Sequence, residues 1–286
     1  MPGQIVTLDF HVTSECSQDC PYCWGPQDYE RPVDTEAALR IIDRVAALGI
    51  RRIVFTGGDP LKRDDVARLI RHAKASGLEV ALSTTGDALT REFLRDAAAD
   101  VDLISLPLDG SNEAVNARTK EPDHFGAVMR ALEWLREYPD VDVKVCTPVT
   151  CHNLDDVPNI LRLVERYAES TDARVFYNIF QAFPRAMFDV DWSELLVGDD
   201  EFADLERRLA GRAGVHVNFL SHATLDRLYA MVFPDGSLVV PQGDVYRSFG
   251  PFLAIDDLDA VLKASPFDAA KHQRHSRGWE KRGCRR

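Results

Sequence analysis

The chain lacks long hydrophobic runs, signal-like features and excess positive charge. No segment approaches the ~20 consecutive apolar residues that span a bilayer, so the sequence predicts no membrane partner. The opening residues, MPGQIVTLDF, lack the basic-then-apolar order of a secretory signal. The formal net charge is −12, which argues against a nucleic-acid partner. Because the six cysteines suit a reducing compartment better than a disulfide scaffold, we expect a cytoplasmic protein.

Two motifs that would indicate other classes of protein are also missing. No G-x-G-x-x-G follows an early predicted strand, which makes a doubly wound dinucleotide-binding sheet the weaker alternative. No second C-x-x-C or H-x-x-x-H pair follows the one cysteine-rich loop. Since a structural zinc site normally needs four ligands, the sequence does not complete one.

The chain does contain a loop with three clustered cysteines, written CSQDCPYC. Cys16, Cys20 and Cys23 offer soft thiolate ligands, which favour zinc, copper(I) or an iron–sulfur cluster. A 4Fe–4S cluster held by only three cysteines leaves one iron open for a substrate or cofactor. The loop therefore predicts a metal centre that can take part in chemistry.

Strand-like and helix-like segments alternate through the first two thirds of the chain. Strands are expected at residues 5–12, 51–55, 78–83, 101–106, 141–149 and 173–180, and helices at 35–48, 63–76, 90–98, 125–137 and 154–168. Six such repeats predict a parallel sheet with helices outside it, curling into an open barrel because the crossovers are right-handed. The predicted fold class is α/β, a partial (β/α)6 TIM-like barrel with its chemistry at the carboxyl ends of the strands.

The composition changes after about residue 190. A helix is expected at 200–209, a β-hairpin around the turn at 234–236, a short helix at 256–263, and then a basic tail. We expect a barrel domain at 1–194 and a small C-terminal α+β cap at 195–286. Outside the triad only Cys146, Cys151 and Cys284 remain, too few for a second four-cysteine cluster, so the cap is expected to lack one.

A second motif, TGGDP at residues 56–60, directly follows the second predicted strand. Glycines let the backbone approach a ligand closely, although such a turn is by itself usually structural. Together with the cysteine spacing and the aromatic Tyr22 before the last cysteine, it resembles the GGEP motif of the radical S-adenosylmethionine (SAM) superfamily. The resemblance implies that the three cysteines hold a 4Fe–4S cluster. It also implies that the motif contacts the amino group of SAM through Gly57, Gly58, Asp59 and Pro60, with Asp59 standing where the family more often has Glu.

The same resemblance implies reductive cleavage of SAM to a 5′-deoxyadenosyl radical, with flavodoxin or ferredoxin as the external reductant. Tyr22 and Trp24 would pack near the adenine or shield the cluster. Thr84 and Ser105 end the third and fourth predicted strands, where hydroxyls could bind the ribose or carboxylate of SAM. Each is equally plausible as a capping or turn residue.

A cap without a cluster favours a redox-neutral outcome such as epimerisation, which returns hydrogen to the substrate radical. Cys146, in the fifth predicted strand, and Cys151, just beyond it, are candidate thiol donors, although a buried cysteine is commonly a small hydrophobe. Tyr229 and Tyr246 are weaker candidates. By class, the functional template is neomycin C epimerase, which predicts a polar, sugar-containing, aminoglycoside-like substrate suited to an acidic chain.

Three alternatives stay open. Residues 197–202 and 265–279 are similar to viperin-type enzymes, which dehydrate a nucleoside triphosphate; the candidate phosphate ligands are Lys271, Arg274 and Arg277. Peptide modification is a second alternative, although no peptide-recognition segment precedes the barrel. An iron–sulfur or zinc-bound regulatory protein is a third, and it predicts metal binding without cleavage of SAM.

Overall fold

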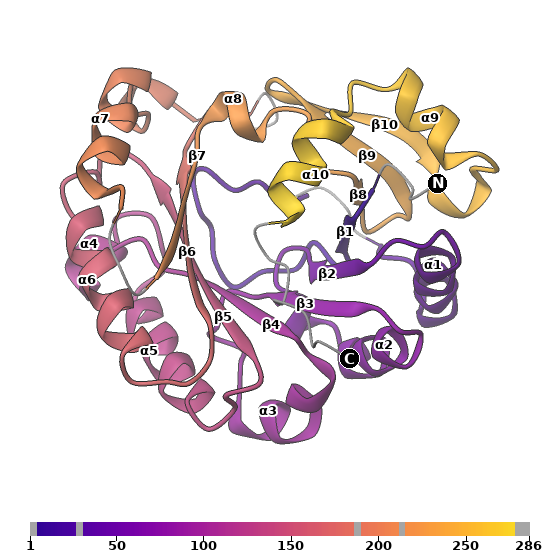
Figure 1. Cartoon of the computed structure of the whole chain (residues 1–286), viewed down its shortest axis with the longest axis horizontal. Coiled ribbons are helices and arrows are strands. Elements are labelled where there is room, and N and C mark those ends of the chain that lie inside the picture. The colour runs from indigo at the N-terminus through magenta and orange to yellow at the C-terminus, as the bar shows by residue number, and fades with distance from the viewer. Residues whose placement is uncertain (1–4, 27–30, 186–189, 212–214, 278–286) are drawn as a thin grey trace.

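The structure, a computed structural model, describes residues 5–26, 31–185, 190–211 and 215–277. Its strands form one sheet in the order β10-β9-β8-β1-β2-β3-β4-β5-β6-β7 (Figure 1). The first six strands are β1 (Thr7–His11), β2 (Arg52–Thr56), β3 (Glu79–Ser83), β4 (Leu103–Pro107), β5 (Asp142–Val149) and β6 (Val175–Gln181). They pair in parallel throughout, which confirms the predicted partial barrel; the sheet is not closed.

Helices cover the outer face of this curved sheet (Figure 1). They are α1 (Thr35–Ala47), α2 (Val66–Ala75), α3 (Arg91–Ala97), α4 (Glu113–Asn116), α5 (His124–Leu135) and α6 (Val157–Ala168). Short 3-10 turns lie at η1 (Pro60–Lys62), η2 (Ala98–Asp100), η3 (Trp192–Glu194) and η4 (Phe252–Ala254). In α1, Asp34 caps the first turn by accepting from the Ala37 N–H, and the buried residues Ile41, Ile42 and Val45 recur at helical spacing.

Alternation along the strands separates the core from the interior of the barrel. On β1, Leu8 and Phe10 are fully buried in the core between sheet and helices, whereas Thr7, Asp9 and His11 face the interior. A parallel strand covered on both faces is usually apolar throughout. Polar residues on the inner face of β1 therefore mark the barrel interior as a site.

The C-terminal third widens the same sheet. It contains α7 (Asp199–Leu209), β7 (His216–Leu220), α8 (His222–Leu225), β8 (Met231–Val232), β9 (Ser237–Gln242), β10 (Val245–Pro251), α9 (Leu258–Ala264) and α10 (Ala269–Arg277). The expected hairpin is confirmed as the antiparallel pair β8–β9, while β8 also pairs in parallel with β1. The sequence prediction missed the two edge strands β7 and β10, the four-residue helices α4 and α8, and the polar helix α10.

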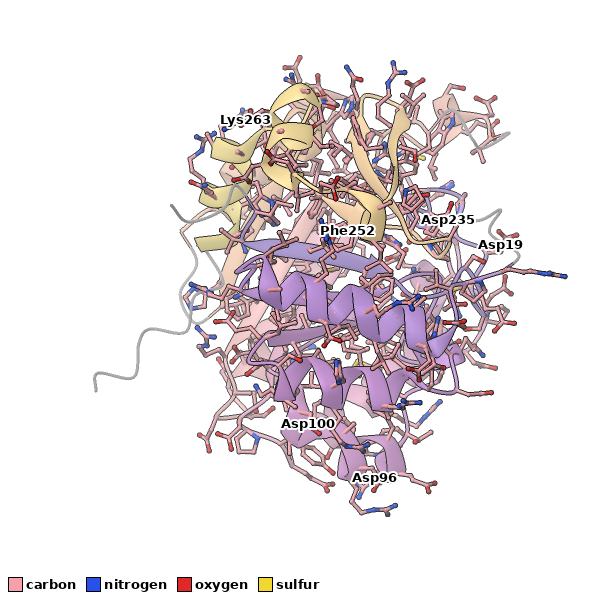
Figure 2. All side chains as sticks on the ribbon, turned by 90° about the vertical axis from the view of Figure 1, so that its right-hand side faces the viewer. Asp19, Asp96, Asp100, Asp235, Phe252 and Lys263 are labelled. Carbon is pink, nitrogen blue, oxygen red and sulfur yellow. The ribbon has the colours of Figure 1, made fainter. Side chains whose placement is uncertain are left out.

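Side-chain contacts join this C-terminal part to the barrel. Figure 2 shows Phe252 at its boundary with α1, where the Arg44 guanidinium lies 5.7 Å from the Phe252 ring. At the other end, His272 on α10 accepts hydrogen bonds from the backbone N–H groups of Val6 and Thr7 at 3.0 and 3.2 Å. Its other ring nitrogen bonds the Leu228 carbonyl at 3.0 Å. These contacts hold α10 against the start of β1.

Candidate active site

A cavity of about 340 Å³ lies inside the barrel and reaches the cysteine loop. It brings together nine predicted site residues: Cys16, Cys20, Tyr22, Cys23, Gly57, Gly58, Thr84, Ser105 and Cys146. Three others, Asp59, Pro60 and Cys151, do not line it. Residues far apart in the sequence thus converge where the carboxyl ends of parallel strands meet, as expected for this kind of barrel.

The cysteine loop presents three free thiols. Cys20 is buried, Cys23 half-buried and Cys16 exposed. Backbone N–H groups approach two of the sulfurs: Gln18 N lies 3.4 Å from Cys16 Sγ, and Gly25 N lies 3.3 Å from Cys23 Sγ. Hydrogen bonds of this kind stabilise thiolate, the form that binds metal.

The third sulfur, Cys20 Sγ, lies beside the positively charged side chain of Lys120. Its Nζ donates to Cys20 Sγ at 3.1 Å and lies 5.5 Å from the centre of the Tyr22 ring. Burial raises the pKa of the Cys20 thiol, and the Lys120 ammonium opposes that rise. The Tyr22 hydroxyl in turn donates to Asp109, which also accepts from Thr119 at 2.7 Å. Lys120 was not anticipated from the sequence, because it lies 100 residues from Cys20.

The glycine motif packs directly against the cysteine loop. Gly58 N donates to Thr13 O at 2.8 Å, and Asp59 N donates to Glu15 O at 2.6 Å. Gly57 has a φ of +154°, and a Cβ there would lie 2.2 Å from Thr13 O. Only glycine fits such an approach, so residues 57–58 hold the loop that carries the cysteines.

Asp59 takes a structural position in this arrangement. Its carboxylate is fully buried and accepts hydrogen bonds from Thr84 Oγ1 at 2.8 Å, Thr85 Oγ1 at 2.6 Å and the Leu61 N–H at 3.1 Å. The side chain therefore ties the end of β2 to the end of β3. The carboxylate does not line the cavity, and contact of SAM with Gly57, Gly58, Asp59 and Pro60 stays a prediction.

The donor set fits a 4Fe–4S cluster. The three soft cysteine ligands line the same cavity, and one of them, Cys20, accepts a hydrogen bond from the buried ammonium group of Lys120. At the neighbouring Gly57 and Gly58, a Cβ atom would clash with the backbone. No group of three or more His, Cys, Asp or Glu is placed to hold one metal ion in the described part of the chain. A cluster does not require convergence on one point, because each cysteine binds a separate iron.

The deep end of the cavity is charged. Asp9, Arg52, Lys144 and His275 line it, and Arg52 pairs with Glu79 outside the cavity at 2.6 Å. Burial raises the pKa of Asp9 to about 7, although Lys144 and Arg52 oppose the rise. Burial likewise lowers the pKa of Lys144. Lys144 interacts electrostatically with Asp9, as Arg52 does with Glu79, so this end of the cavity holds buried charges of both signs.

Three buried cationic residues line the cavity: Arg52 and Lys144 on strands, and Lys120 beside Cys20. Asp9 is the single carboxylate of the described lining. The described lining thus has more basic than acidic side chains, whereas the chain as a whole has a net charge of −12. The sequence prediction of a cationic substrate relied on that overall charge. Strand alternation places Asp9 and Lys144 on inner faces and is a separate, local guide to the charge of the substrate, which stays a prediction.

The two candidate thiol donors lie in different places. Cys146 lines the cavity, and its Sγ is 3.3 Å from Ser105 Oγ. Cys151 is exposed outside it and donates to Glu194 O at 2.6 Å. The structure therefore keeps Cys146 as a candidate and does not bring Cys151 to the site. Cys284 lies outside the described residues.

An aromatic wall closes the cavity beside Cys23. Trp24 packs edge-on against Tyr229, with ring centres 4.9 Å apart, and Arg185 lies 4.4 Å from the Trp24 ring. Tyr246 hydrogen-bonds the Trp24 carbonyl. Arg185 is almost fully buried, yet its sequence context, F-P-R, gave no sign of it. Trp24 thus serves as a wall of the cavity.

The predicted phosphate ligands of the tail lie beside a second hollow of about 850 Å³ between β7, α8 and α10. Arg274 lines it, as does Lys271, whose Nζ donates to the carbonyls of Ala223 and Asp226 at 2.8 and 2.9 Å. His275 lines both this hollow and the main cavity. The side chain of Arg277 lies outside the described residues.

A partial barrel with a three-cysteine loop and a glycine pair at its mouth defines an iron–sulfur barrel enzyme. The family model of the Radical SAM superfamily matches residues 10–164, more than half of the chain. The chain belongs to the radical SAM superfamily. Its cofactors are therefore a 4Fe–4S cluster and SAM.

Two curated relatives align with different shares of this chain. The AdoMet-dependent heme synthase of Methanosarcina barkeri is 29% identical over 187 residues, covering 64% of this chain and 52% of the relative. The chain thus spans about half the length of that protein. The S-adenosylmethionine-dependent nucleotide dehydratase of Flammeovirga pacifica is 25% identical over 255 residues, covering 85% of this chain and 84% of the relative.

Solved structures agree on the fold. Native anSMEcpe with bound AdoMet superposes with a TM-score of 0.68 at 14% identity, covering 96% of this chain and 84% of that one. Streptococcus suis SuiB gives 0.69 at 12% identity, covering 94% and 67%. At these identities the likeness shows the fold alone. No helix in the described ranges is long and apolar enough to cross a membrane.

Proposed function

We propose that this protein is a radical SAM enzyme that abstracts hydrogen from an anionic, sugar-containing small molecule, and that its reaction is dehydration of a nucleotide. The observation that supports the proposal is the lining of the cavity, in which the basic residues Arg52, Lys120 and Lys144 outnumber Asp9, the one carboxylate of the described lining, although Arg52 also pairs with Glu79 and Lys120 with Cys20. An aminoglycoside carries several positive charges and would be repelled there. The phosphate groups of a nucleotide would bind the buried cations, and its ribose would lie at the reacting position.

Overall similarity supports the same reaction. The nucleotide dehydratase aligns over 85% of this chain, including the C-terminal part, whereas the heme synthase aligns over 64%. Loss of water from a sugar leaves the substrate's oxidation state unchanged: the abstracted hydrogen ends in 5′-deoxyadenosine, the hydroxyl leaves as water, and the external reductant would supply the electron that completes the balance. No auxiliary cluster would then have to take up electrons, in keeping with a cap for which none is expected. Peptide modification, the activity that the names of other relatives suggest, has less support in a cavity with this charge.

When bound, the cluster and SAM supply the 5′-deoxyadenosyl radical. The protein's own residues then have distinct tasks. The cysteine triad and Lys120 hold the metal centre, Gly57 and Gly58 admit the methionine part of SAM, and the deep cations bind the anionic end of the substrate. The wall at Trp24 and Tyr229 excludes water from the reacting positions.

Epimerisation remains a second candidate because Cys146 lines the cavity, where its thiol could return a hydrogen atom to a substrate radical. Flavodoxin or ferredoxin is the proposed electron source, and the cytoplasm the proposed compartment. The described cysteines are all free thiols, in keeping with a reducing environment.

Affinity measurements on the cluster-loaded protein test the charge of the site. We expect nucleoside triphosphates to bind and an aminoglycoside such as neomycin not to bind. Lys144→Met should weaken triphosphate binding by roughly tenfold to a hundredfold, the value of one charge-assisted contact. Lys263→Met, an exposed change on α9, is the matched control and should have no effect. Equal losses in both variants would contradict the proposal.

A further inference from the structure

His11 ends β1 with an unused acceptor inside the cavity. His11 lies two residues after Asp9 on the same, inward-facing side of β1, lines the cavity and is 5% exposed. Its Nδ1 is buried and has no hydrogen-bond partner in the structure. Buried polar atoms almost always have partners, so an orphaned one that faces a ligand cavity points to a ligand.

The ring is fixed in place on two sides. It is hydrogen-bonded to the backbone of Gly57, and the Phe233 ring stands edge-on with its centre 5.1 Å away. A bond to a backbone carbonyl uses the N–H of one ring nitrogen, which leaves the other with a lone pair. Burial, the larger effect, lowers the pKa of His11 to about 3. The imidazole is therefore neutral, and its free Nδ1 accepts rather than donates.

The charge of the cavity selects the kind of donor. A cationic donor, such as an ammonium group, would meet the positive lining described above. A neutral hydroxyl group meets no such repulsion and can donate one hydrogen bond to His11 Nδ1. His11 lies between the glycine pair, at the cysteine-loop end, and Asp9 in the charged end. A sugar held between those two ends passes this position.

We propose that His11 Nδ1 accepts a hydrogen bond from a ribose hydroxyl of a ligand bound in this cavity, and so positions that sugar. Two ligands carry this chemistry, the ribose of SAM and the ribose of a nucleotide substrate. The nucleotide case rests on the proposed function, whereas the SAM case does not. The role differs from that of Asp9 and Lys144, because it recognises a neutral group.

Equilibrium binding to the anaerobic, cluster-loaded protein tests the inference without turnover. The probes are SAM with its 2′-deoxy and 3′-deoxy analogues, and CTP with the corresponding two deoxy analogues. His11→Leu removes the acceptor while keeping an apolar contact for Phe233. His11→Asn places an amide oxygen close to the position of Nδ1 and restores an acceptor. Thermal unfolding and iron content report on folding and on the cluster.

For one of the two ligands, we expect His11→Leu to weaken binding of the ribose form about tenfold. For one deoxy analogue of that ligand, the His11→Leu variant and the wild-type protein should have equal affinities. His11→Asn should recover most of the affinity for the ribose form that His11→Leu loses. Unchanged affinity of His11→Leu for both ribose forms would overturn the inference, as would equal losses for the ribose and deoxy forms. If wild type binds no CTP, the proposed function loses support while the SAM series still decides the role of His11.

Discussion

Lys120 Nζ lies 3.1 Å from Cys20 Sγ, so a buried ammonium contacts a predicted cluster ligand. A positive charge stabilises the reduced form of a cluster more than the oxidised form, and hydrogen bonds to the sulfurs act in the same direction. Lys120→Met should therefore lower the midpoint potential of the cluster, by on the order of 50 mV. An EPR-monitored redox titration measures it, with Lys263→Met as control. An unchanged midpoint would mean that Lys120 does not influence the cluster.

Gly57 and Gly49 offer a matched pair of glycines with positive φ. A Cβ at Gly57 would meet Thr13 O at 2.2 Å, whereas a Cβ at Gly49 would have nothing within 4 Å. Gly49→Ala should cost about 1 kcal/mol of unfolding free energy from backbone strain alone. Gly57→Ala should cost at least twice as much and reduce the iron content after reconstitution. Urea unfolding of both variants measures the difference, and equal stability would contradict the close packing described for this loop.

Asp9 should make anion binding depend on pH. Its pKa is raised from 3.8 to about 7, so the carboxyl is mostly neutral at pH 6 and mostly charged at pH 8. The charged form repels an anion, and affinity for a triphosphate should fall as pH rises through 7, by roughly tenfold. Asp9→Asn removes this dependence. The titration of the phosphate itself is common to both proteins and cancels in the ratio of their dissociation constants.

The pH experiment has a clear opposite outcome. If wild type and Asp9→Asn change in parallel between pH 6 and pH 8, Asp9 does not titrate in that range or does not face the bound anion. In either case the charge assigned to the deep end of the cavity would be wrong.

Cys146 distinguishes the two candidate reactions. Dehydration needs no hydrogen returned from a thiol, so Cys146→Ala should keep product formation within about threefold of wild type, as for a modest packing change. Epimerisation through Cys146 predicts uncoupling, in which 5′-deoxyadenosine accumulates and product does not. Product analysis in D2O separates the cases, because a thiol donor delivers solvent deuterium. Cys151→Ala, an exposed change outside the cavity, is the control.

The sequence predicted the barrel well because its evidence is local. Hydrophobic periodicity and turn residues placed the first six strands, and β5 was expected at 141–149 and lies at Asp142–Val149. The predicted metal ligands rest on equally local evidence, since three cysteines stand within one short loop. The pairing of β8 with β1 depends on contacts between distant segments, which no local pattern contains.

The rest of the site escaped prediction for the same reason. Lys120 reaches Cys20 across 100 residues, and His272 reaches Val6 across 266. Net charge averages over the whole chain and does not report the local charge of the cavity, where Arg52 and Lys144 are buried. Asp59 was predicted as a ligand contact from its motif, but no local pattern shows that its carboxylate also accepts hydrogen bonds from Thr84 and Thr85.

Turnover by the reconstituted protein tests the central claim most directly. The protein, loaded anaerobically with iron and sulfide, is incubated with dithionite and SAM, and 5′-deoxyadenosine is quantified with nucleoside triphosphates or with aminoglycosides against a Cys20→Ala control. We predict that a triphosphate stimulates 5′-deoxyadenosine formation and yields a nucleotide lighter by one water. Stimulation by an aminoglycoside alone, or no 5′-deoxyadenosine from a loaded cluster with any substrate, would contradict the account.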